Sequence, residues 1–259
     1  MLTSLQNPLI KQLRKLHQAK ARRTQGRFLI EGSHLLQEAC ALGHSLDCLC
    51  YTEAWQARYP QLAQQAQELA QQAVLVSAEV LAAIATTVNP DGVVATLPHQ
   101  VWAMPEEIQL GLAIETLQDP GNLGSLIRTG AAAGCEGLWL SEDSVDPENP
   151  KVLRSSAGQW FRLPVGSVPD LGAQVQQWQG QGIQVVATTA AADRNYWQVD
   201  WRQPSVILLG NEGAGLSEDL LDRVAVQVGI PMAAGVESLN VAIAAALLLY
   251  EARRQRQGG

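Results

Sequence analysis

The sequence is poor in cysteine, in long apolar runs and in the glycine patterns of nucleotide-binding loops. Its four cysteines, Cys40, Cys48, Cys50 and Cys135, form no CxxC pair and no zinc-like spacing with histidine, so we expect reduced thiols of a cytosolic protein and no metal site. The longest apolar run, 241–250, is too short for a membrane-spanning helix, and no export signal begins the chain. Neither GxGxxG nor GxxxxGK[ST] occurs, which disfavours a dinucleotide fold and a phosphate loop.

Charged residues are also few, and they are unevenly distributed. They make up 17% of the chain against 47% apolar residues, which predicts a soluble globular protein. A net charge of −7 alone argues against a nucleic-acid partner, because phosphate binding depends mainly on lysine and arginine. Residues 1–30 reverse that argument, since they hold seven of the 18 basic residues and no acid precedes Glu31. The seven are Lys11, Arg14, Lys15, Lys20, Arg22, Arg23 and Arg27.

The first of these basic residues lie on a predicted amphipathic helix. Asn7-Pro8 is typical of an N-cap followed by the first helical position. Leu9, Leu13 and Leu16 then recur at helical spacing, with basic residues between them. A cationic helix face that binds RNA and an ordinary solvated face both fit this pattern.

Short apolar runs alternate with helical patterns along the chain, which predicts an α/β fold. We expect one helix over 53–72 and a strand at 74–76. Residues 98–106 have prolines at both ends and little periodicity, which indicates a linker. We therefore expect two α/β domains, residues 1–105 and 106–259.

Three segments lie where a predicted strand gives way to a helix, the edge at which open α/β sheets bind ligands. They are DPGNLGSLIRTG (119–130), LLGNEGAGLSEDL (208–220) and IPMAAGVESLN (230–240). In the first, Asn122 and Arg128 lie within about 120° of each other around a helix, so both can border one cavity. Three such segments in one domain predict a composite site.

Each segment also has a plainer interpretation. The glycines of the second suit tight turns as well as the close approach of a flat ligand. Arg128 suits a surface ion pair, and Ser238 or Glu237 suits a helix cap. Against the cap, we expect Asn240 inside the first turn of a helix that is apolar all round and therefore buried, where an amide needs hydrogen-bond partners.

Taken in order, the three segments resemble the signature motifs of the SpoU/TrmH-type RNA ribose methyltransferases, a branch of the SPOUT class. The motifs are IETLQDPGNLGSLIRTGAAAG, ILLGNEGAGLSEDLL and IPMAAGVESLNVAIAAALLLYEARRQR, and VLRSSAGQWFRLPV between them is also similar to the family. This resemblance covers roughly residues 108–256. The N-terminal SLQNPLIKQLRKL and RRTQGRFLIEGSHLLQEA resemble the L30e-like substrate-binding domain that many members carry.

The resemblance implies a fold and a reaction. The fold is an L30e-like α/β domain followed by a SPOUT domain with a parallel sheet and a trefoil knot, and the assembly is a homodimer formed through the C-terminal domain. The reaction uses S-adenosylmethionine to methylate a ribose 2′-hydroxyl of RNA, ribosomal RNA by preference and transfer RNA as the alternative. No metal is required.

The resemblance also assigns roles to residues. Catalytic positions fall on Arg128, Asn122, Glu212, Ser238 and Asn240, and the donor pocket on Gly210, Asn211, Gly213, Ile230, Met232 and Leu239. RNA phosphates are expected at Lys11, Arg14, Lys15, Arg22, Arg23 and Arg27, and Ser156 and Gly158 are expected to border the RNA. Because arginine stays protonated, we expect Arg128 to hold a phosphate and polarise the hydroxyl rather than remove its proton.

Two other classes of function stay open. A non-catalytic L30e-like RNA-binding protein is one, although the set of polar residues retained in the three motifs speaks against it. An NAD-linked α/β enzyme is the other, and the missing glycine fingerprint speaks against that. Binding of S-adenosylmethionine without binding of nicotinamide nucleotides distinguishes these alternatives.

Overall fold

The computed structural model describes residues 1–258, which divide into two compact units. The first consists of residues 1–101 and 146–161, and the second of residues 102–145 and the chain from Arg162 onward. These units divide the chain differently from the predicted domains 1–105 and 106–259, because residues 146–161 pack with the first unit. The predicted domains stay a proposal. Among the described residues, no helix has the length and apolar content needed to cross a membrane.

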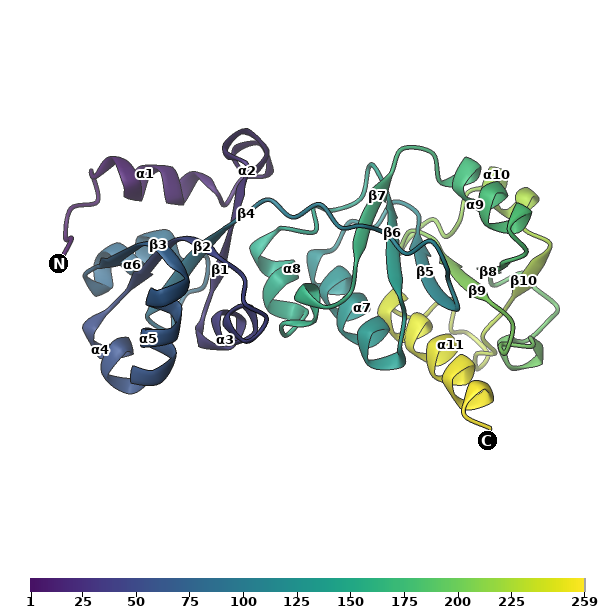
Figure 1. Ribbon diagram of the computed structural model, residues 1–259. Helices are drawn as coiled ribbons and strands as arrows, with labels where there is room; N and C mark the ends of the chain where they lie inside the picture. Colours follow the sequence, from purple (N-terminus) through teal and green to yellow (C-terminus); the bar gives the residue numbers. More distant parts are fainter. Residues whose placement is uncertain (259) are drawn as a thin grey trace. The chain divides into compact units, whose positions relative to one another are not determined.

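The first unit is a four-stranded sheet with helices on both faces (Figure 1). Strand β4 is antiparallel to β1 and β2, and β3 is parallel to β2, in the order β1-β4-β2-β3. The strands are β1 (Arg27–Glu31), β2 (Leu46–Tyr51), β3 (Ala70–Leu75) and β4 (Val93–Pro98). The helices are α1 (Pro8–Lys15), α2 (Ala19–Gln25), α3 (Ser33–Ala41), α4 (Glu53–Arg58), α5 (Pro60–Leu69), α6 (Ala78–Ile84), α8 (Pro150–Ser155) and the 3-10 turn η1 (Gln159–Phe161).

Side chains that alternate along the strands supply a core to each face of this sheet. Leu29 of β1 belongs to a buried cluster with Ile10 of α1 and Leu81 of α6. Its neighbour Phe28 lies on the opposite face, where its ring centroid is 5.0 Å from that of Trp160. The segment 146–161 is therefore part of the core of this unit.

The predicted helix over 53–72 is wrong, because two helices and a strand occupy it. Helix α4 ends before Tyr59, and Pro60, which has no amide hydrogen to donate, starts α5. Strand β3 begins at Ala70, four residues before the predicted strand. Its first residues are mostly exposed at the edge of the sheet, so the apolar signal of a buried strand is absent.

The second unit is a six-stranded sheet in which every pair of neighbouring strands is parallel, in the order β10-β8-β9-β5-β6-β7. The strands are β5 (Leu110–Ile114), β6 (Gly137–Ser141), β7 (Val165–Val168), β8 (Gln184–Thr188), β9 (Ser205–Leu209) and β10 (Val226–Val228). The helices are α7 (Pro120–Ala133), α9 (Leu171–Gly180), α10 (Glu218–Arg223), α11 (Val241–Arg256) and the 3-10 turn η2 (Tyr196–Gln198). The predicted α/β class with a parallel sheet is confirmed, and the trefoil knot stays a prediction.

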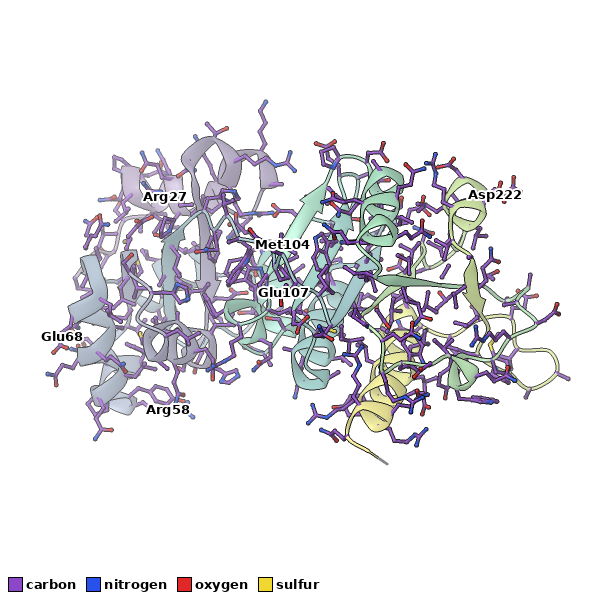
Figure 2. The ribbon with its side chains drawn as sticks, turned by 45° about the vertical axis from the view of Figure 1, so that its right-hand side comes forward. Arg27, Arg58, Glu68, Met104, Glu107 and Asp222 are labelled. Carbon is purple, nitrogen blue, oxygen red and sulfur yellow. The ribbon has the colours of Figure 1, made fainter. Side chains whose placement is uncertain are left out.

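Helices cover both faces of the parallel sheet. Trp139 of β6 packs against Trp178 of α9 with ring centroids 5.2 Å apart, in a core shared with α10. Leu112 of β5 faces α7, where a Cβ added at Gly130 would lie 3.4 Å from the Leu112 side chain. Met104, labelled in Figure 2, lies against Gly166 at the edge strand β7.

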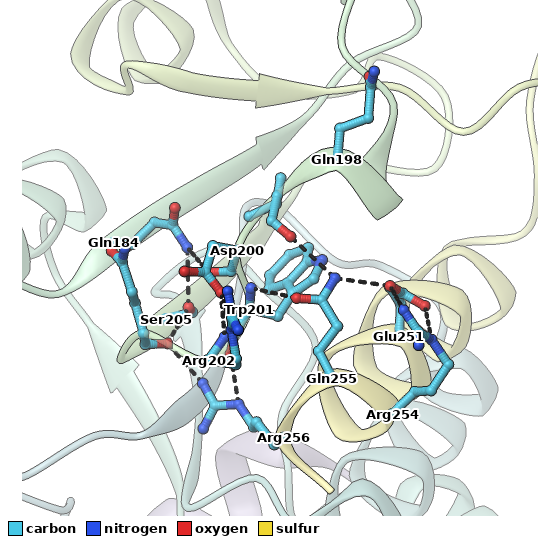
Figure 3. Close-up of polar contacts among 12 residues, drawn as sticks. Gln184, Gln198, Asp200, Trp201, Arg202, Ser205, Glu251, Arg254, Gln255 and Arg256 are labelled. Carbon is cyan, nitrogen blue, oxygen red and sulfur yellow. Dashed lines mark hydrogen bonds and ion pairs between the residues drawn. The ribbon is translucent and has the colours of Figure 1, made fainter. Parts of the chain in front are cut away.

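The last helix is tied to the segment before β9 by polar contacts at its C-terminal end (Figure 3). The Gln255 side chain accepts from the Trp201 amide at 3.0 Å and donates to the Val199 carbonyl at 3.1 Å. The Arg256 guanidinium donates to the carbonyls of Trp201 and Gln203, both at 2.8 Å. These bonds fix the direction of α11, and so the place of its N-terminus.

Candidate functional site

A cavity of about 480 Å³ lies at the carboxyl ends of β8, β9 and β10, within the size range of small-molecule pockets. Its wall is formed mainly by the second and third glycine-bearing segments and by residues 188–190 at the end of β8. We call it the donor cavity. All six residues predicted to contact the donor line it, namely Gly210, Asn211, Gly213, Ile230, Met232 and Leu239.

The 210–215 loop gives the donor cavity a wall made of backbone. A side chain at Gly210 would place its Cβ 2.0 Å from the carbonyl carbon of Gly215, so only glycine fits there. Asn211 and Gly215 exchange two backbone hydrogen bonds of 3.0 and 2.9 Å. The Asn211 Oδ1 atom also accepts from the amides of Gly213 and Ala214 at 2.9 and 3.1 Å. The glycines therefore serve a tight turn and the cavity wall at once.

Asn211 also connects this loop to the first motif. Its Nδ2 donates to the Thr116 carbonyl at 2.8 Å. Thr116 has a φ of 54°, a conformation that costs a β-branched residue on the order of 1–3 kcal/mol. The Thr116 amide donates to Ser141 Oγ and its hydroxyl to Asp143, both at 2.7 Å. Side chains at and just after the end of β6 thus hold the strained residue that positions the donor loop.

Three of the predicted catalytic residues form one hydrogen-bonded chain. Asn240 donates from Nδ2 to Asn122 Oδ1 at 2.9 Å, and Asn122 donates from Nδ2 to Glu212 Oε1 at 3.0 Å. The three residues come from three different motifs, and Glu212 lines the donor cavity. The first motif, which supplies no residue to the lining, is therefore joined to the cavity through Asn122.

The start of α11 fixes the direction of this chain. Asn240 Oδ1 accepts from the amides of Ala242 and Ile243 at 3.0 and 3.3 Å, so its Nδ2 must point outward to Asn122. Asn240 is the N-cap, so the prediction that it lies inside the first turn is wrong, and the alternative of a cap at Ser238 or Glu237 is ruled out as well. Ser238 lines the donor cavity instead.

Arg128 stands apart from the donor cavity. It is exposed on α7 and is not among the residues that line the cavity. Asn122, near the start of the same helix, is held by the cap at Asp119, whose carboxylate accepts from the Asn122 amide at 2.9 Å. The catalytic role of Arg128 stays a prediction.

One face of α11 is exposed, so the prediction that this helix is buried all round is wrong. Ile243, Leu247 and Tyr250 are 55%, 36% and 51% exposed, and they line a shallow hollow with Ser125 and Thr129 of α7. The opposite face carries the buried residues Val241, Ala242, Ala245, Leu248, Leu249 and Ala252. We call the exposed residues the apolar stripe.

The predicted RNA-binding residues of the first unit divide into exposed and buried ones. Lys11, Arg14, Lys15 and Arg23 are exposed, and the first three line a hollow of about 390 Å³ on α1. Arg27, labelled in Figure 2, is half-buried, with its Nε 3.8 Å from Asp47.

Three residues expected at the RNA are buried instead. Arg22 is only 2% exposed, and its guanidinium is engaged with Asp146, which corrects its prediction as a phosphate contact. The Ser156 hydroxyl is buried and donates to the Leu153 carbonyl at 2.7 Å. Gly158 packs so closely on Glu38 that no side chain fits there. Ser156 and Gly158 thus do not border a surface.

Sequence reasoning missed part of the donor cavity. Thr188, the last residue of β8, lines it together with Thr189 and Ala190, which follow that strand. They carry no glycine pattern and no charge. The rule that ligands bind at the carboxyl ends of parallel strands is the one signal that could have found them.

Comparisons with known proteins agree with this geometry. Residues 109–250 match the model of the SpoU rRNA Methylase family, and residues 7–95 match the MRM3-like substrate binding domain. The chain is 50% identical over 257 residues to an uncharacterized tRNA/rRNA methyltransferase of Synechocystis sp., covering 98% of this chain and 94% of that relative. It is 33% identical over 255 residues to the 23S rRNA (guanosine(2553)-2′-O)-methyltransferase RlmP of Bacillus subtilis, covering 97% and 98%. The AdoMet-bound rRNA methyltransferase from Sinorhizobium meliloti has a TM-score of 0.86 at 33% identity, covering 98% of this chain and 97% of that one.

Proposed function

This chain belongs to the SpoU rRNA methylase family, and from that premise we propose that it transfers the methyl group of S-adenosylmethionine to a ribose 2′-hydroxyl of ribosomal RNA. The observation that carries the proposal is the hydrogen-bonded chain of Asn240, Asn122 and Glu212, which joins three motifs at the donor cavity. We also propose a cytoplasmic reaction, because ribosomal RNA is the substrate.

The donor cavity suits S-adenosylmethionine. Gly210 lets the backbone of Gly215 pack against it, which keeps the 210–215 loop tight against the cavity, and Ile230 and Leu239 in the lining supply apolar contacts for an adenine. Glu212 and Glu237 in the lining supply negative charge for a cationic ligand. When bound, the donor supplies a methyl group on a positively charged sulfur, which becomes a neutral thioether as the bond from the ribose oxygen to the methyl carbon forms.

The polar chain orients the reacting groups. With Asn240 held by the helix start and Asn122 held by Asn240, the Glu212 carboxylate has a fixed position at the edge of the cavity. Such a fixed acceptor aligns the ribose hydroxyl with the methyl group at no cost in reorganisation. Ser238, on the same lining, supplies a further hydroxyl to the rim.

Arg128 acts from outside the cavity wall in this proposal. A guanidinium stays charged at the pH of the reaction, so it holds the phosphate next to the target ribose and favours the alkoxide that develops as the hydroxyl proton passes to water. The exposed position of Arg128 suits a partner as large as RNA.

We further propose that the second unit forms a homodimer through the apolar stripe. Ile243, Leu247 and Tyr250 together expose an apolar surface at helical spacing, a pattern that marks a protein interface. Ser125 and Thr129 border the same hollow on α7, on either side of Arg128 in sequence. Pairing of two such faces would bring Arg128 to the edge of the interface.

The direct test incubates the purified protein with methyl-labelled S-adenosylmethionine and a 23S ribosomal RNA transcript, and then maps the label. We expect it on a ribose 2′-oxygen. Label on a base, or RNA binding without any transfer, would contradict the proposal, and the second outcome would favour the non-catalytic RNA-binding alternative.

A further inference from the structure

Arg22 is the one basic residue among positions 1–30, all of them described, whose side chain is buried. Its Nε and Nη2 atoms donate to Asp146 Oδ2 at 3.0 and 2.5 Å. Its Nη1 donates to the carbonyls of Leu16 and His17 at 2.8 and 3.1 Å. The guanidinium fork is thus engaged on all three nitrogens, which leaves no side free for a phosphate.

These bonds join the two basic helices at a corner. Arg22 belongs to α2, whereas Leu16 is the C-cap of α1 and His17 follows it. A guanidinium at the carboxyl end of a helix satisfies carbonyls that have no partner in the helix and offsets the negative end of its dipole. Arg22 therefore sets the angle at which α2 leaves α1.

The same corner borders the basic hollow on α1. Lys11, Arg14 and Lys15 line the hollow together with His17, Gln18 and Ala83, and none of these residues is acidic. His17 belongs to both structures, because its carbonyl accepts from Arg22 while its ring bonds to the Ile84 carbonyl at 2.6 Å. His17, which forms part of the wall of the hollow, is thus fixed by bonds to both Arg22 and Ile84.

Asp146 is anchored independently of Arg22. Its Oδ1 atom accepts from the Glu148 amide at 2.9 Å, and it lies 124 residues from Arg22 in the sequence. It follows directly on residue 145, where the chain passes into the 146–161 segment of the first unit. The carboxylate is thus a fixed point to which the corner is tied.

We propose that Arg22 and Asp146 are positioning residues for RNA binding. They hold the α1–α2 corner so that its exposed cations match the spacing of a sugar–phosphate backbone, and they do not touch the RNA themselves. This inference rests on the proposed function, which supplies RNA as the partner. It distinguishes Arg22 from Arg23, its exposed neighbour on the same helix.

The sharpest test is Asp146→Asn, because charge and geometry predict opposite results. Removing an acid from a phosphate-binding surface should tighten RNA binding if charge alone matters. We expect binding of a 23S ribosomal RNA transcript to weaken by about tenfold instead, because an amide nitrogen in place of Oδ2 would face the Arg22 donors and release the corner. Unchanged or tighter binding would overturn the proposal.

A matched pair of variants keeps the charge constant. Arg22→Lys loses the fork while retaining one positive charge, and Arg23→Lys makes the same change at an exposed site. We expect Arg23→Lys, whose lysine keeps a cation at an exposed phosphate contact, to weaken binding of the transcript by less than about twofold, and Arg22→Lys to weaken it by about fivefold. In methyl transfer, Arg22→Lys should raise KM for RNA and leave kcat unchanged. Equal affinities for the two variants would refute the positioning role.

Two controls separate the possible failures. The affinity for S-adenosylmethionine should be the same in all three variants, and circular dichroism should show wild-type helix content. If Asp146→Asn loses helix content, its RNA affinity no longer tests the proposal, and the comparison of Arg22→Lys with Arg23→Lys is the test. If the wild type neither binds nor methylates the transcript, the proposed function fails, whereas weak binding confined to the Arg23 variant contradicts only this inference.

Discussion

The donor cavity of the second unit and the basic corner of the first are built by different means. The cavity is shaped by backbone, with a glycine that admits no Cβ and with amide side chains whose orientation a helix start fixes. The corner presents exposed cationic side chains on a frame held by one buried ion pair. We infer that the cavity is sensitive to added atoms, and that the corner is sensitive to the loss of an exposed cation or of the ion pair that holds it.

The largest expected effect is on the chemical step. Arg128→Ala should lower the rate of methyl transfer by about 10³-fold, because a fixed charge that stabilises the transition state is lost. Donor affinity should stay within about twofold of the wild type, since Arg128 does not line the cavity. Single-turnover transfer and calorimetric titration measure the two quantities. Transfer at nearly the wild-type rate would remove Arg128 from the mechanism.

Gly210→Ala tests the backbone wall directly. The added Cβ would meet the Gly215 carbonyl carbon at 2.0 Å, so the loop must move, and we expect about 100-fold weaker donor binding. Gly213→Ala is the matched control, since its Cβ would meet only Asn211 Oδ1, at the ordinary contact distance of 3.5 Å. Similar affinities in the two variants would show that loop shape does not govern donor binding.

Two substitutions at Asn240 distinguish its role as the N-cap of α11 from its role in the hydrogen-bonded chain to Glu212. Asn240→Ala removes both, and we expect about 1 kcal/mol of stability and about tenfold in transfer rate to be lost. Asn240→Asp keeps the acceptor for the Ala242 amide but cannot donate to Asn122. Its thermal stability should therefore match the wild type while transfer remains slow. Normal transfer by Asn240→Asp would mean that the chain to Glu212 has no part in the reaction.

A smaller effect is expected at an exposed cation of the corner. Arg23→Gln should weaken RNA binding by about threefold at moderate salt and reduce the slope of log affinity against log salt by about one. Donor binding should not change. A slope identical to that of the wild type would place Arg23 outside the RNA contact.

The smallest effect concerns a buried carboxyl of the first unit. Burial raises the pKa of Glu148, although hydrogen bonds from His99 and from the Gln100 amide oppose the rise. A raised folded-state pKa favours the folded protein below about pH 4.5, and that contribution is lost as the pH rises through the folded-state value. In Glu148→Gln this position stays neutral at every pH. The Tm of the variant minus the Tm of the wild type should therefore be about 2 °C larger at pH 7 than at pH 4. A difference in Tm that is independent of pH would contradict this.

The same difference between the units explains how much of the site the sequence could predict. Gly210 and Asn211 belong to a loop whose geometry depends on residues close to one another in the sequence, so a local motif predicts it. Such loops lie together because they follow the carboxyl ends of parallel strands. The burial of Arg22 depends on Asp146, which is distant in sequence, so no local pattern reveals it. The sequence shows how many basic residues the N-terminal region contains, but it does not show which of their side chains are exposed.

Two features of the fold were hidden for related reasons. Strand β3 is an edge strand with exposed polar residues, so its sequence, AQQAVL, gives a helical signal until the parallel pairing with β2 overrides it. Helix α11 is apolar on all sides, and periodicity alone cannot tell a face that packs within the chain from the apolar stripe.

The most direct test of the account is a crystal structure of the protein with S-adenosylmethionine bound. We predict that the adenosine lies against the backbone of Gly210 and between Ile230 and Leu239, with the methyl group directed toward the Glu212 end of the polar chain. A donor bound elsewhere on the second unit, with the 210–215 loop and Leu239 free of contact, would contradict the account.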